Sequence, residues 1–403
     1  MTKDNILKNK LLLMKRQPGE PLDCLLPLNT LVLSDNSKNV ESAFIEPKIK
    51  KCNTNYVITD TSGKYYQKYA KFLECNGYTV RKLDFNDMND SYMYNPIEYL
   101  RTEADFFTIT RILKNTFFTG EDNFFFENLK YLTKEVLLCA VISYVAIHEP
   151  DPAKRNFARV YELIASVKSD SDKDDFKQAF EGVKAFEPYS FAAAQYEQFC
   201  QLATEKTRDS VITELLSQMS LFKAPNIKAL TAIDELDLHD FEDKKLAIFI
   251  CIPCENTTYN FLALMLYTQI YRLLEKYVSN SCPGHHPPRN CQFIMDKFPD
   301  IGRFELLAEM MSVGQKDGII CSIICESIEQ LADIYEKEIN AIVSNCPVKI
   351  LLHTASETTA EWAADVLCEG EINASQLMHM PENEYIANIQ YAYRKFLKCD
   401  TDL

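Results

Sequence analysis

Two patterns of apolar positions alternate along the first part of the chain. Short apolar runs bounded by turn residues predict strands at residues 28–33 (LNTLVL), Asn55–Asp60 and 78–85 (YTVRKLDF). Between the last two runs, Tyr65, Tyr69 and Leu73 recur at helical spacing, and Gly77 follows the last turn. A further helix is predicted around Ser42 to Ile49. This alternation of strands and helices predicts a parallel sheet covered by helices.

The strand pattern disappears from about Glu103 to about Lys223. Long stretches such as NLKYLTKEVLLCAVISYVAIH and NFARVYELIASVK have helical period and composition, with DPAKR and FEPYS as breakers. We therefore expect a separate all-α domain at residues 106–224.

Buried strands then return. Apolar runs predict strands at residues 245–253, 291–298, 319–327 and 348–354. Helical patterns fill the intervals at residues 257–278, 303–318, 328–345 and 357–369, and a short tail closes the chain. Residues 27–105 and 225–403 are thus expected to form the two halves of one α/β domain, interrupted by the helical insertion.

Composition narrows the function classes. The chain has 403 residues, of which 47% are hydrophobic and 25% charged, as in soluble globular proteins. No run of 18 apolar residues occurs, and the N-terminal LLLM is too short for a signal peptide, so no membrane span is expected. We expect a cytoplasmic protein that reaches a membrane only through partners. Its 14 cysteines are expected to be reduced thiols.

The net charge of −15 disfavours a general nucleic-acid binder, although a local basic patch is not excluded. Glycine is scarce, with only 10 residues. That scarcity matters because loops that hold phosphate usually need glycine.

The order of several segments carries a resemblance to a known family. YNPIEYL, TTYNFLALMLYTQ and MDKFPDIG occur in fixed order among the predicted strands. From Leu28 to about Ile389 the chain resembles the conjugative coupling proteins of type IV secretion (TraG/TraD-type), and the Gram-positive branch most. The resemblance implies an α/β fold of the RecA-like P-loop NTPase type, a mostly parallel sheet flanked by helices with an inserted all-α domain. Such proteins are hexameric ATPases that hand DNA and protein to a secretion channel. Members usually carry two N-terminal membrane helices, and this sequence shows neither.

The family's phosphate loop has lost its chemistry here. Without a gap, Ser34 and Asn39 stand where the two spaced glycines belong, Val40 replaces the lysine and Glu41 replaces the hydroxyl residue. Asp35 and Glu41 would bring negative charge to the phosphates. At ~4 Å, unit charges of like sign repel by ~4 kcal/mol at an effective dielectric of 20. We expect Ser34–Glu41 to form a strand–helix turn held by Asp and Asn side chains, with no nucleotide in it.

Four further motifs depart from what the resemblance implies. Where the family reads Asp-Glu after a buried strand, Asp296 remains but Lys297 replaces the glutamate, which would activate water. Glu326 and Ser327 occupy a Gln-Asn position that senses the γ-phosphate. Gln315 and Asp317 fill the positions of arginines that reach a neighbouring subunit's nucleotide. Of an Asp-Pro-Lys-Gly-Glu motif, Asp60 and Gly63 remain.

These losses favour a catalytically degenerate homologue, a pseudo-ATPase that acts through protein contacts in conjugative transfer or on a mobile element. No catalytic residue, cofactor or metal is expected, and the protein could assemble with itself or with other subunits. One alternative is a subunit that still binds ATP and Mg²⁺ in a mixed hexamer. Another is a module that binds single-stranded DNA or cargo without using ATP.

Other constellations have ordinary explanations. Cys251 and Cys254 form a CxxC that ends a strand, whereas a redox pair should open a helix, so we interpret them as one buried and one surface cysteine. A proline-rich loop holds residues of the types that bind zinc, which stays the less favoured alternative to a surface loop: Cys282, His285, His286 and Cys291.

Two more features stay open. The aromatic run Phe117–Leu129 either contacts a partner or single-stranded DNA bases, or fills the junction with the helical domain, which we favour. His353 is interpreted as a hydrogen-bonding residue at a strand end. The short basic segment with Lys48, Lys50 and Lys51 is interpreted as a solvated face.

Overall fold

One nine-stranded sheet organises the protein. The computed structural model describes residues 10–15, 27–117, 125–167, 175–203, 205–253, 256–381 and 384–389. The strands follow the order β1-β9-β8-β2-β7-β6-β3-β5-β4 across the sheet. Their bounds are β1 Lys10–Lys15, β2 Thr30–Ser34, β3 Asn55–Asp60, β4 Thr79–Asp84, β5 Leu246–Cys251, β6 Cys291–Met295, β7 Ile319–Cys325, β8 Val348–His353 and β9 Glu384–Ile389.

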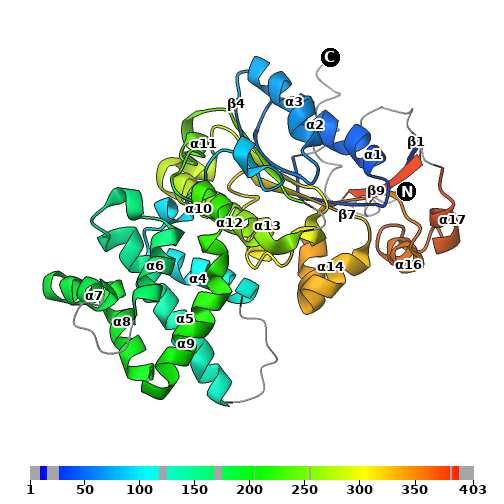
Figure 1. The fold of residues 1–403 in the computed structure, drawn as a ribbon. Coiled ribbons are helices and arrows are strands. Elements are labelled where there is room, and N and C mark those ends of the chain that lie inside the picture. Colours follow the sequence, from blue (N-terminus) through cyan, green and yellow to red (C-terminus); the bar gives the residue numbers. More distant parts are fainter. Residues whose placement is uncertain are drawn as a thin grey trace. The chain divides into compact units, whose positions relative to one another are not determined.

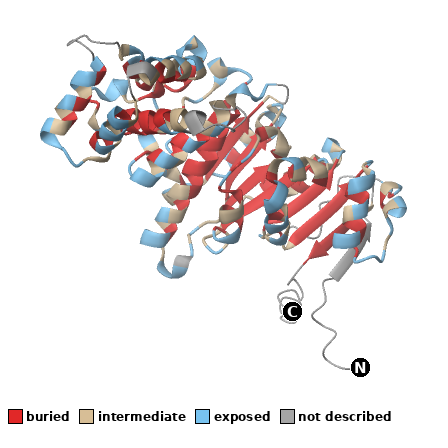
Figure 2. Ribbon diagram, turned by 90° about the horizontal axis from the view of Figure 1, so that it is seen from below, coloured by how far each residue is buried: buried red, intermediate tan, exposed pale blue. Residues whose placement is uncertain are grey.

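The inner strands run parallel and are buried. β2 pairs in parallel with β7 and β8, and β3 pairs in parallel with β5 and β6. Figure 2 shows these strands as the buried layer of the protein. Near-continuous apolar sequence such as LAIFIC and IICSIIC is what a strand covered on both faces requires. The predicted mostly parallel α/β sheet is therefore confirmed.

Helices cover both faces of the sheet. Figure 1 shows α1, α2 and α3 on one face, and α13 and α14 on the other. The first group, with the turn at Glu41–Ile45 that joins α1 to α2, buries Phe44, Ile49 and Leu73 in one core with Val32, Ile58 and Ile350 of the sheet. The bounds are α1 Ser37–Val40, α2 Glu46–Lys50, α3 Lys64–Cys75, α11 Asp240–Asp243, α12 Asn260–Ser281, α13 Leu307–Ser312, α14 Ile328–Tyr335, α15 Ile339–Ser344, α16 Glu357–Val366 and α17 Ala374–Met378.

The chain divides into two compact units. The α/β unit comprises Met1–Lys82, Leu238–Asn260 and Ile270–Leu403, and the helical unit comprises Leu83–Asp237 and Phe261–Gln269. The remaining helices are α4 Glu103–Phe117, α5 Phe125–Ser143, α6 Phe157–Ser166, α7 Asp175–Phe186, α8 Phe191–Leu202, α9 Glu205–Gln218 and α10 Pro225–Leu230.

The helical unit has its own aromatic core. Phe180 stacks on Tyr196 with ring centroids 4.6 Å apart, and Phe176 packs beside Phe180 at 4.9 Å. Among the described residues one helical stretch, Leu129–His148, is long and apolar enough to cross a membrane, but 72% of its apolar window is buried inside the protein. Helix packing accounts for that apolar sequence.

The sequence patterns did not predict β1, the edge strand, or its neighbour β9. β9 runs antiparallel between β8 and β1, where a short tail was expected, and β1 contains the LLLM run. Glu384 and Asn388 interrupt the apolar pattern of β9. Asn388 is buried, and its Nδ2 donates to the Leu367 carbonyl at 3.0 Å. A strand of this kind is specified by its neighbours rather than by its own sequence.

Several predicted elements are shorter in the structure. The strand expected at 291–298 stops at Met295, because Lys297 adopts a left-handed conformation with φ 48°. The helix expected at 303–318 is regular only over α13, and the helix expected at 328–345 breaks at Glu336, where φ is 36°. Helical period persists across such breaks, so the sequence does not locate them.

Candidate functional site

Four of the residues singled out in the sequence lie at one edge of the sheet. Ser34 ends β2, Asp60 ends β3, Asp296 follows β6 and Glu326 follows β7. These four strands are neighbours in the order β2-β7-β6-β3, and their carboxyl ends point the same way. In parallel α/β sheets this edge is where ligands bind.

The connection after β2 is only two residues long. Asp35 and Asn36 lead directly into α1, and α1, a π-helical turn at Glu41–Ile45 and α2 follow without a break. Asn36 caps this helix, because its side chain accepts from the Asn39 N–H at 3.2 Å. The widened π turn lies just before Pro47, which cannot donate a backbone hydrogen bond. The helix thus begins at Ser37, five residues before the predicted start.

Several backbone donors of this segment have partners within the chain. The Asn36 N–H donates to Ser34 Oγ at 3.2 Å, and the Val40 N–H donates to the Asn36 carbonyl at 3.1 Å. The Glu41 N–H donates into the preceding turn, to the carbonyls of Ser37 and Lys38. A phosphate loop instead points consecutive N–H groups at its ligand.

Asp35 ties this turn to the end of β8. Its Oδ1 lies 2.5 Å from His353 Nδ1, and its Oδ2 accepts from the Ala355 N–H at 2.8 Å. β2 and β8 are adjacent strands, so the contact spans 318 positions of sequence but only one strand spacing. His353 therefore has a hydrogen-bonding role at a strand end.

Glu41 and Val40 are engaged on the other side. Glu41 Oε1 lies 2.8 Å from Lys68 Nζ and 3.2 Å from the Tyr69 hydroxyl, both on α3. Glu46 joins the same group through Lys68, and its contacts with Lys50 and Lys68 lower its pKa to about 2. Val40 is 2% exposed and packs in the core beneath the helix. Position 40 thus faces the protein interior rather than the edge of the sheet.

The two aspartates of the edge are buried and have internal partners. Asp296 is 6% exposed; its Oδ2 accepts from the Tyr65 hydroxyl at 2.7 Å, and its Oδ1 accepts from the Lys297 N–H at 3.0 Å. Asp60 accepts from the N–H groups of Tyr66 and Ser62. Burial raises the pKa of both carboxyl groups.

Lys297 faces an acidic partner. Its Nζ lies 3.8 Å from Glu326 Oε1, which follows the adjacent strand β7. The Glu326 N–H donates to Gln330 Oε1, and Ser327 caps α14. The residues at the Gln-Asn position therefore contact Lys297 and the first turn of α14.

The remaining two predicted positions lie at the opposite edge. Gln315 and Asp317 precede β7, whose first residue is Ile319, so they belong to the amino ends of the strands. Gln315 Oε1 accepts from Asn29 Nδ2 at 3.2 Å. Asn29 is fully buried there, and its Oδ1 accepts from the Cys321 N–H at 2.8 Å.

The Asp296→Asn substitution should change how stability depends on pH. Burial raises the pKa of Asp296 above its unfolded value, so the protonated form favours folding, and this stabilisation is lost as pH rises through the raised pKa. The variant keeps a neutral side chain, so its thermal midpoint relative to wild type should increase as pH rises from 4, by about 2 °C or more. Thermal unfolding in a pH series measures the difference.

The control is Asp333→Asn, which removes a carboxylate from an exposed position outside the candidate site. A difference between Asp296→Asn and wild type that stays constant with pH would contradict the raised pKa.

Other sequence candidates are only partly described. Cys251 is buried at the end of β5, and Cys254 lies outside the described residues. Cys291 is buried at the start of β6 and burial raises the pKa of its thiol, while the side chain of His285 lies outside the described residues. Among the described side chains, no three of His, Cys, Asp or Glu stand close enough to hold a metal ion.

The aromatic run is described only at its ends. Phe117 packs on Phe222 and Phe261 within the helical unit, with ring centroids 6.4 and 5.2 Å away. The side chains of residues 118–128 lie outside the described residues.

Sequence reasoning missed the partners that complete the edge. Tyr65 and Tyr69 were assigned only as apolar helix positions, yet their hydroxyls bind Asp296 and Glu41. A tyrosine at a core position is a signal in itself, because a buried hydroxyl needs a hydrogen-bond partner. No feature of the sequence marks Lys68 or Asn29 as a hydrogen-bond partner of the candidate residues.

Comparison with known proteins places this fold in a family. A model of the family described as "Type IV secretory system Conjugative DNA transfer" matches residues 42–371. The match starts one residue after Glu41, so it does not include Ser34–Glu41. VirD4 of Rhizobium radiobacter is 23% identical over 176 residues, covering 43% of this chain and 25% of that protein. The conjugal transfer protein TraG of Escherichia coli is 27% identical over 155 residues, covering 36% of this chain and 24% of that protein. The matches thus span about a quarter of these curated relatives.

Solved structures agree in fold. The bacterial conjugative coupling protein TrwBdeltaN70, in complex with sulphate, has a TM-score of 0.65 at 14% identity, over 91% of this chain and 84% of that one. TrwB with the non-hydrolysable ATP analogue ADPNP has a TM-score of 0.61 at 14% identity, over 90% and 85%. Because the family model covers most of the chain and these folds agree with the RecA-like architecture, the chain belongs to the type IV secretory system conjugative DNA transfer family.

Proposed function

We propose that this chain is a coupling-protein homologue that works without hydrolysing ATP, through contacts with proteins of a conjugation or secretion machinery. The observation that carries the proposal is the turn after β2. A helix beginning at Ser37 takes the place of an open loop, and the N–H groups of Asn36, Val40 and Glu41 donate within the chain.

Electrostatics support the same conclusion. TrwB has been solved with ADPNP and with ADP and Mg²⁺, so nucleotide is the ligand to test here. At the corresponding edge of this chain, Asp35 and Glu41 carry the wrong charge for a phosphate. Asp296 has both oxygens in internal hydrogen bonds, and Lys297 lies where a base would be needed. These residues do not fit ATP and Mg²⁺, so no catalytic step is assigned to them.

Two residues at the opposite edge of the sheet support the loss of a second function, which is action on a neighbouring subunit's nucleotide. In the resemblance to coupling proteins, the positions of Gln315 and Asp317 would carry arginines that act on a neighbouring subunit's nucleotide. Both residues lie away from the chain's own candidate site, at the amino ends of the strands. We infer that this chain neither hydrolyses ATP nor completes a neighbour's site, and that it contributes structure to an assembly of machinery proteins on the cytoplasmic side.

A turnover assay tests the proposal. Purified protein with Mg-ATP should release phosphate no faster than Asp296→Asn protein prepared in parallel, because neither has a functional site. Each of the two samples should have the same thermal midpoint with ATP as without it, since a ligand that does not bind cannot stabilise the fold.

Two outcomes would contradict it. Turnover in the natural protein that Asp296→Asn abolishes would show an active ATPase. An ATP-dependent rise in the thermal midpoint without turnover would instead support the nucleotide-binding subunit of a mixed hexamer.

A further inference from the structure

Two aromatic side chains of the helical unit stand almost entirely in solvent. Phe186 ends α7 and is 89% exposed, and Tyr189 lies just before α8 and is 98% exposed. We call residues 186–189 the aromatic loop. Single exposed apolar residues are ordinary on soluble proteins, but Phe and Tyr are enriched where proteins bind one another. Two such rings within four residues therefore mark a contact for another protein surface.

Hydrogen bonds restrain the backbone of the aromatic loop. The Glu187 N–H donates to the Val183 carbonyl at 2.7 Å, and the Ser190 N–H donates to the Glu187 carbonyl at 3.0 Å. Ser190 also caps α8, because its Oγ accepts from the Ala193 N–H at 3.3 Å. Pro188 fixes its own φ angle. Little backbone entropy is then lost when the two rings are covered.

A cavity of about 230 Å³ adjoins this loop in the same unit. Ile97 and Ala146 in its wall are buried, and Ile147 is 43% exposed. Glu187 Oε2 lies 4.0 Å from Nδ1 of His148, the residue after Ile147, so the loop and the cavity are neighbours. The lining residues are Ile97, Glu98, Arg101, Ala146, Ile147 and Arg155.

The cavity and the aromatic loop carry opposite charges. Glu98 lies 3.9 Å from Arg101, so Arg155 gives the cavity its net positive charge. Its Nε donates to a backbone carbonyl at 3.0 Å, and within the described part of the chain no carboxylate pairs with Arg155. Glu187 is the one charged residue of the loop, and burial lowers the pKa of its neighbour His148, which is therefore neutral at pH 7 and above. Arginine also attracts the face of an aromatic ring.

Size favours an aromatic ring as the occupant of this cavity. About 150 Å³ is enough to hold a benzene ring. The rings of the chain's own aromatic loop do not enter, because they stay exposed. A second copy of the chain supplies both the ring and the acidic residue that the cavity lacks.

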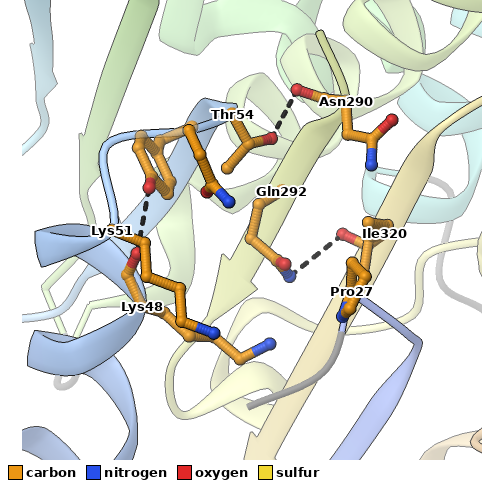
Figure 3. Close-up of a pocket in the computed structure, with 9 residues that line it drawn as sticks. Pro27, Lys48, Lys51, Thr54, Asn290, Gln292 and Ile320 are labelled. Carbon is orange, nitrogen blue, oxygen red and sulfur yellow. Dashed lines mark hydrogen bonds between the residues drawn. The ribbon is translucent and has the colours of Figure 1, made fainter. Parts of the chain in front are cut away.

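The cavity at the amino edge of the sheet does not suit a ring. It has a volume of only about 100 Å³. In its wall, the Thr54 hydroxyl donates to the Asn290 carbonyl and Gln292 Nε2 donates to the Ile320 carbonyl, as Figure 3 shows. An apolar group placed there would cover polar atoms that need hydrogen bonds or water.

We propose that two copies of this chain pair through their helical units, with the aromatic loop of each copy filling the cavity of the other. Loop and cavity are neighbours on one unit, so a two-fold axis makes the contact twice. Covering a Phe or Tyr buries about 150–250 Å², and two such loops with the matching cavity walls bury about 1,200–2,000 Å². That is the size of a specific protein interface.

Sedimentation equilibrium of the full chain tests the proposal. At about 50 µM the protein should be mainly a dimer, and at about 0.5 µM mainly a monomer, as a micromolar interface of this size predicts. The double variant Phe186→Ser/Tyr189→Ser should weaken pairing about 100-fold, because each dimer contains the contact twice. Both rings are exposed, so the fold and its thermal midpoint should be kept.

Tyr92→Ser is the matched control for the loop variant. Tyr92 is an aromatic residue of the same unit, 38% exposed and outside both the loop and the cavity. Its loss should leave the dissociation constant within about twofold.

A charge exchange tests which surfaces meet. Arg101→Glu at the exposed rim of the cavity should weaken pairing about tenfold, whereas Lys228→Glu, an exposed charge reversal elsewhere in the unit, should not. Adding Glu187→Arg to Arg101→Glu should restore pairing to within about threefold of the natural chain, because the loop and the cavity again carry opposite charges.

Four results would overturn the proposal. A monomer at about 50 µM would leave the loop and the cavity to a different partner. A dimer that the loop variant does not weaken would place the interface elsewhere. Assemblies that keep growing with concentration would exclude two-fold closure. A double charge variant that pairs no better than Arg101→Glu alone would separate the loop from the cavity. None of these results bears on ATP hydrolysis, which concerns the α/β unit.

Discussion

Val40→Lys, which supplies the lysine of the proposed phosphate-loop alignment, is expected to lower the free energy of unfolding by about 4 kcal/mol and to create no ATP turnover. Val40 is 2% exposed and packs in the cluster that includes Phe44, Ile58 and Tyr69. A lysine there must bury its ammonium group or pull the helix from the sheet. The N–H groups of Asn39, Val40 and Glu41 still donate within the chain, to Asn36 and to the first helical turn.

Urea unfolding of the natural protein and of two variants measures the effect. Ser37→Lys is the matched control, because it adds the same charge to the exposed first residue of the same helix. It should cost at most about 1 kcal/mol, the scale of a cation near a helix N-terminus. A Val40→Lys protein that is as stable as Ser37→Lys and gains ATP-dependent stabilisation would mean that the phosphate loop is latent rather than lost.

The sequence could predict that the candidate residues gather at one edge. Asp60, Asp296 and Glu326 each follow a strongly apolar run, and parallel strands bring their carboxyl ends together whatever the side chains do. The strands themselves were predictable because they are covered on both faces and therefore almost entirely apolar. This part of the structure depends on patterns that are local in the chain.

The contacts within that edge could not be predicted in the same way. Asp296 binds Tyr65 across 231 positions, and Asp35 binds His353 across 318 positions. Each partner is set by strand order and by which residues face one another, neither of which the local pattern contains. The start of the helix at Ser37 was also not predictable from the local pattern. Ser, Asn and Asp favour turns and caps equally well, so SDNSKN is compatible with a loop and with a capped helix.

Local sequence patterns likewise did not predict β1 and β9. A substitution in β9 is expected to have the second large effect on stability. Ile386→Asp is expected to lower the free energy of unfolding by about 4 kcal/mol or more, through lost apolar burial and a buried carboxylate. Ile386 is fully buried in β9, where it pairs with Leu351 of β8 and with position 13 of β1. Urea unfolding and the fraction of soluble protein measure the change.

Ile386→Val is the control that keeps the strand apolar, and it should cost only about 1 kcal/mol. The comparison decides what β9 contributes, because the two variants differ in polarity at one position of one strand. If β9 is an integral strand, the aspartate should also expose the edge of β8 and promote aggregation, since an unpaired strand edge readily pairs with another chain. Equal stability and solubility of the two variants would mean that the sheet ends at β8, and that pairing with β9 adds little to the fold.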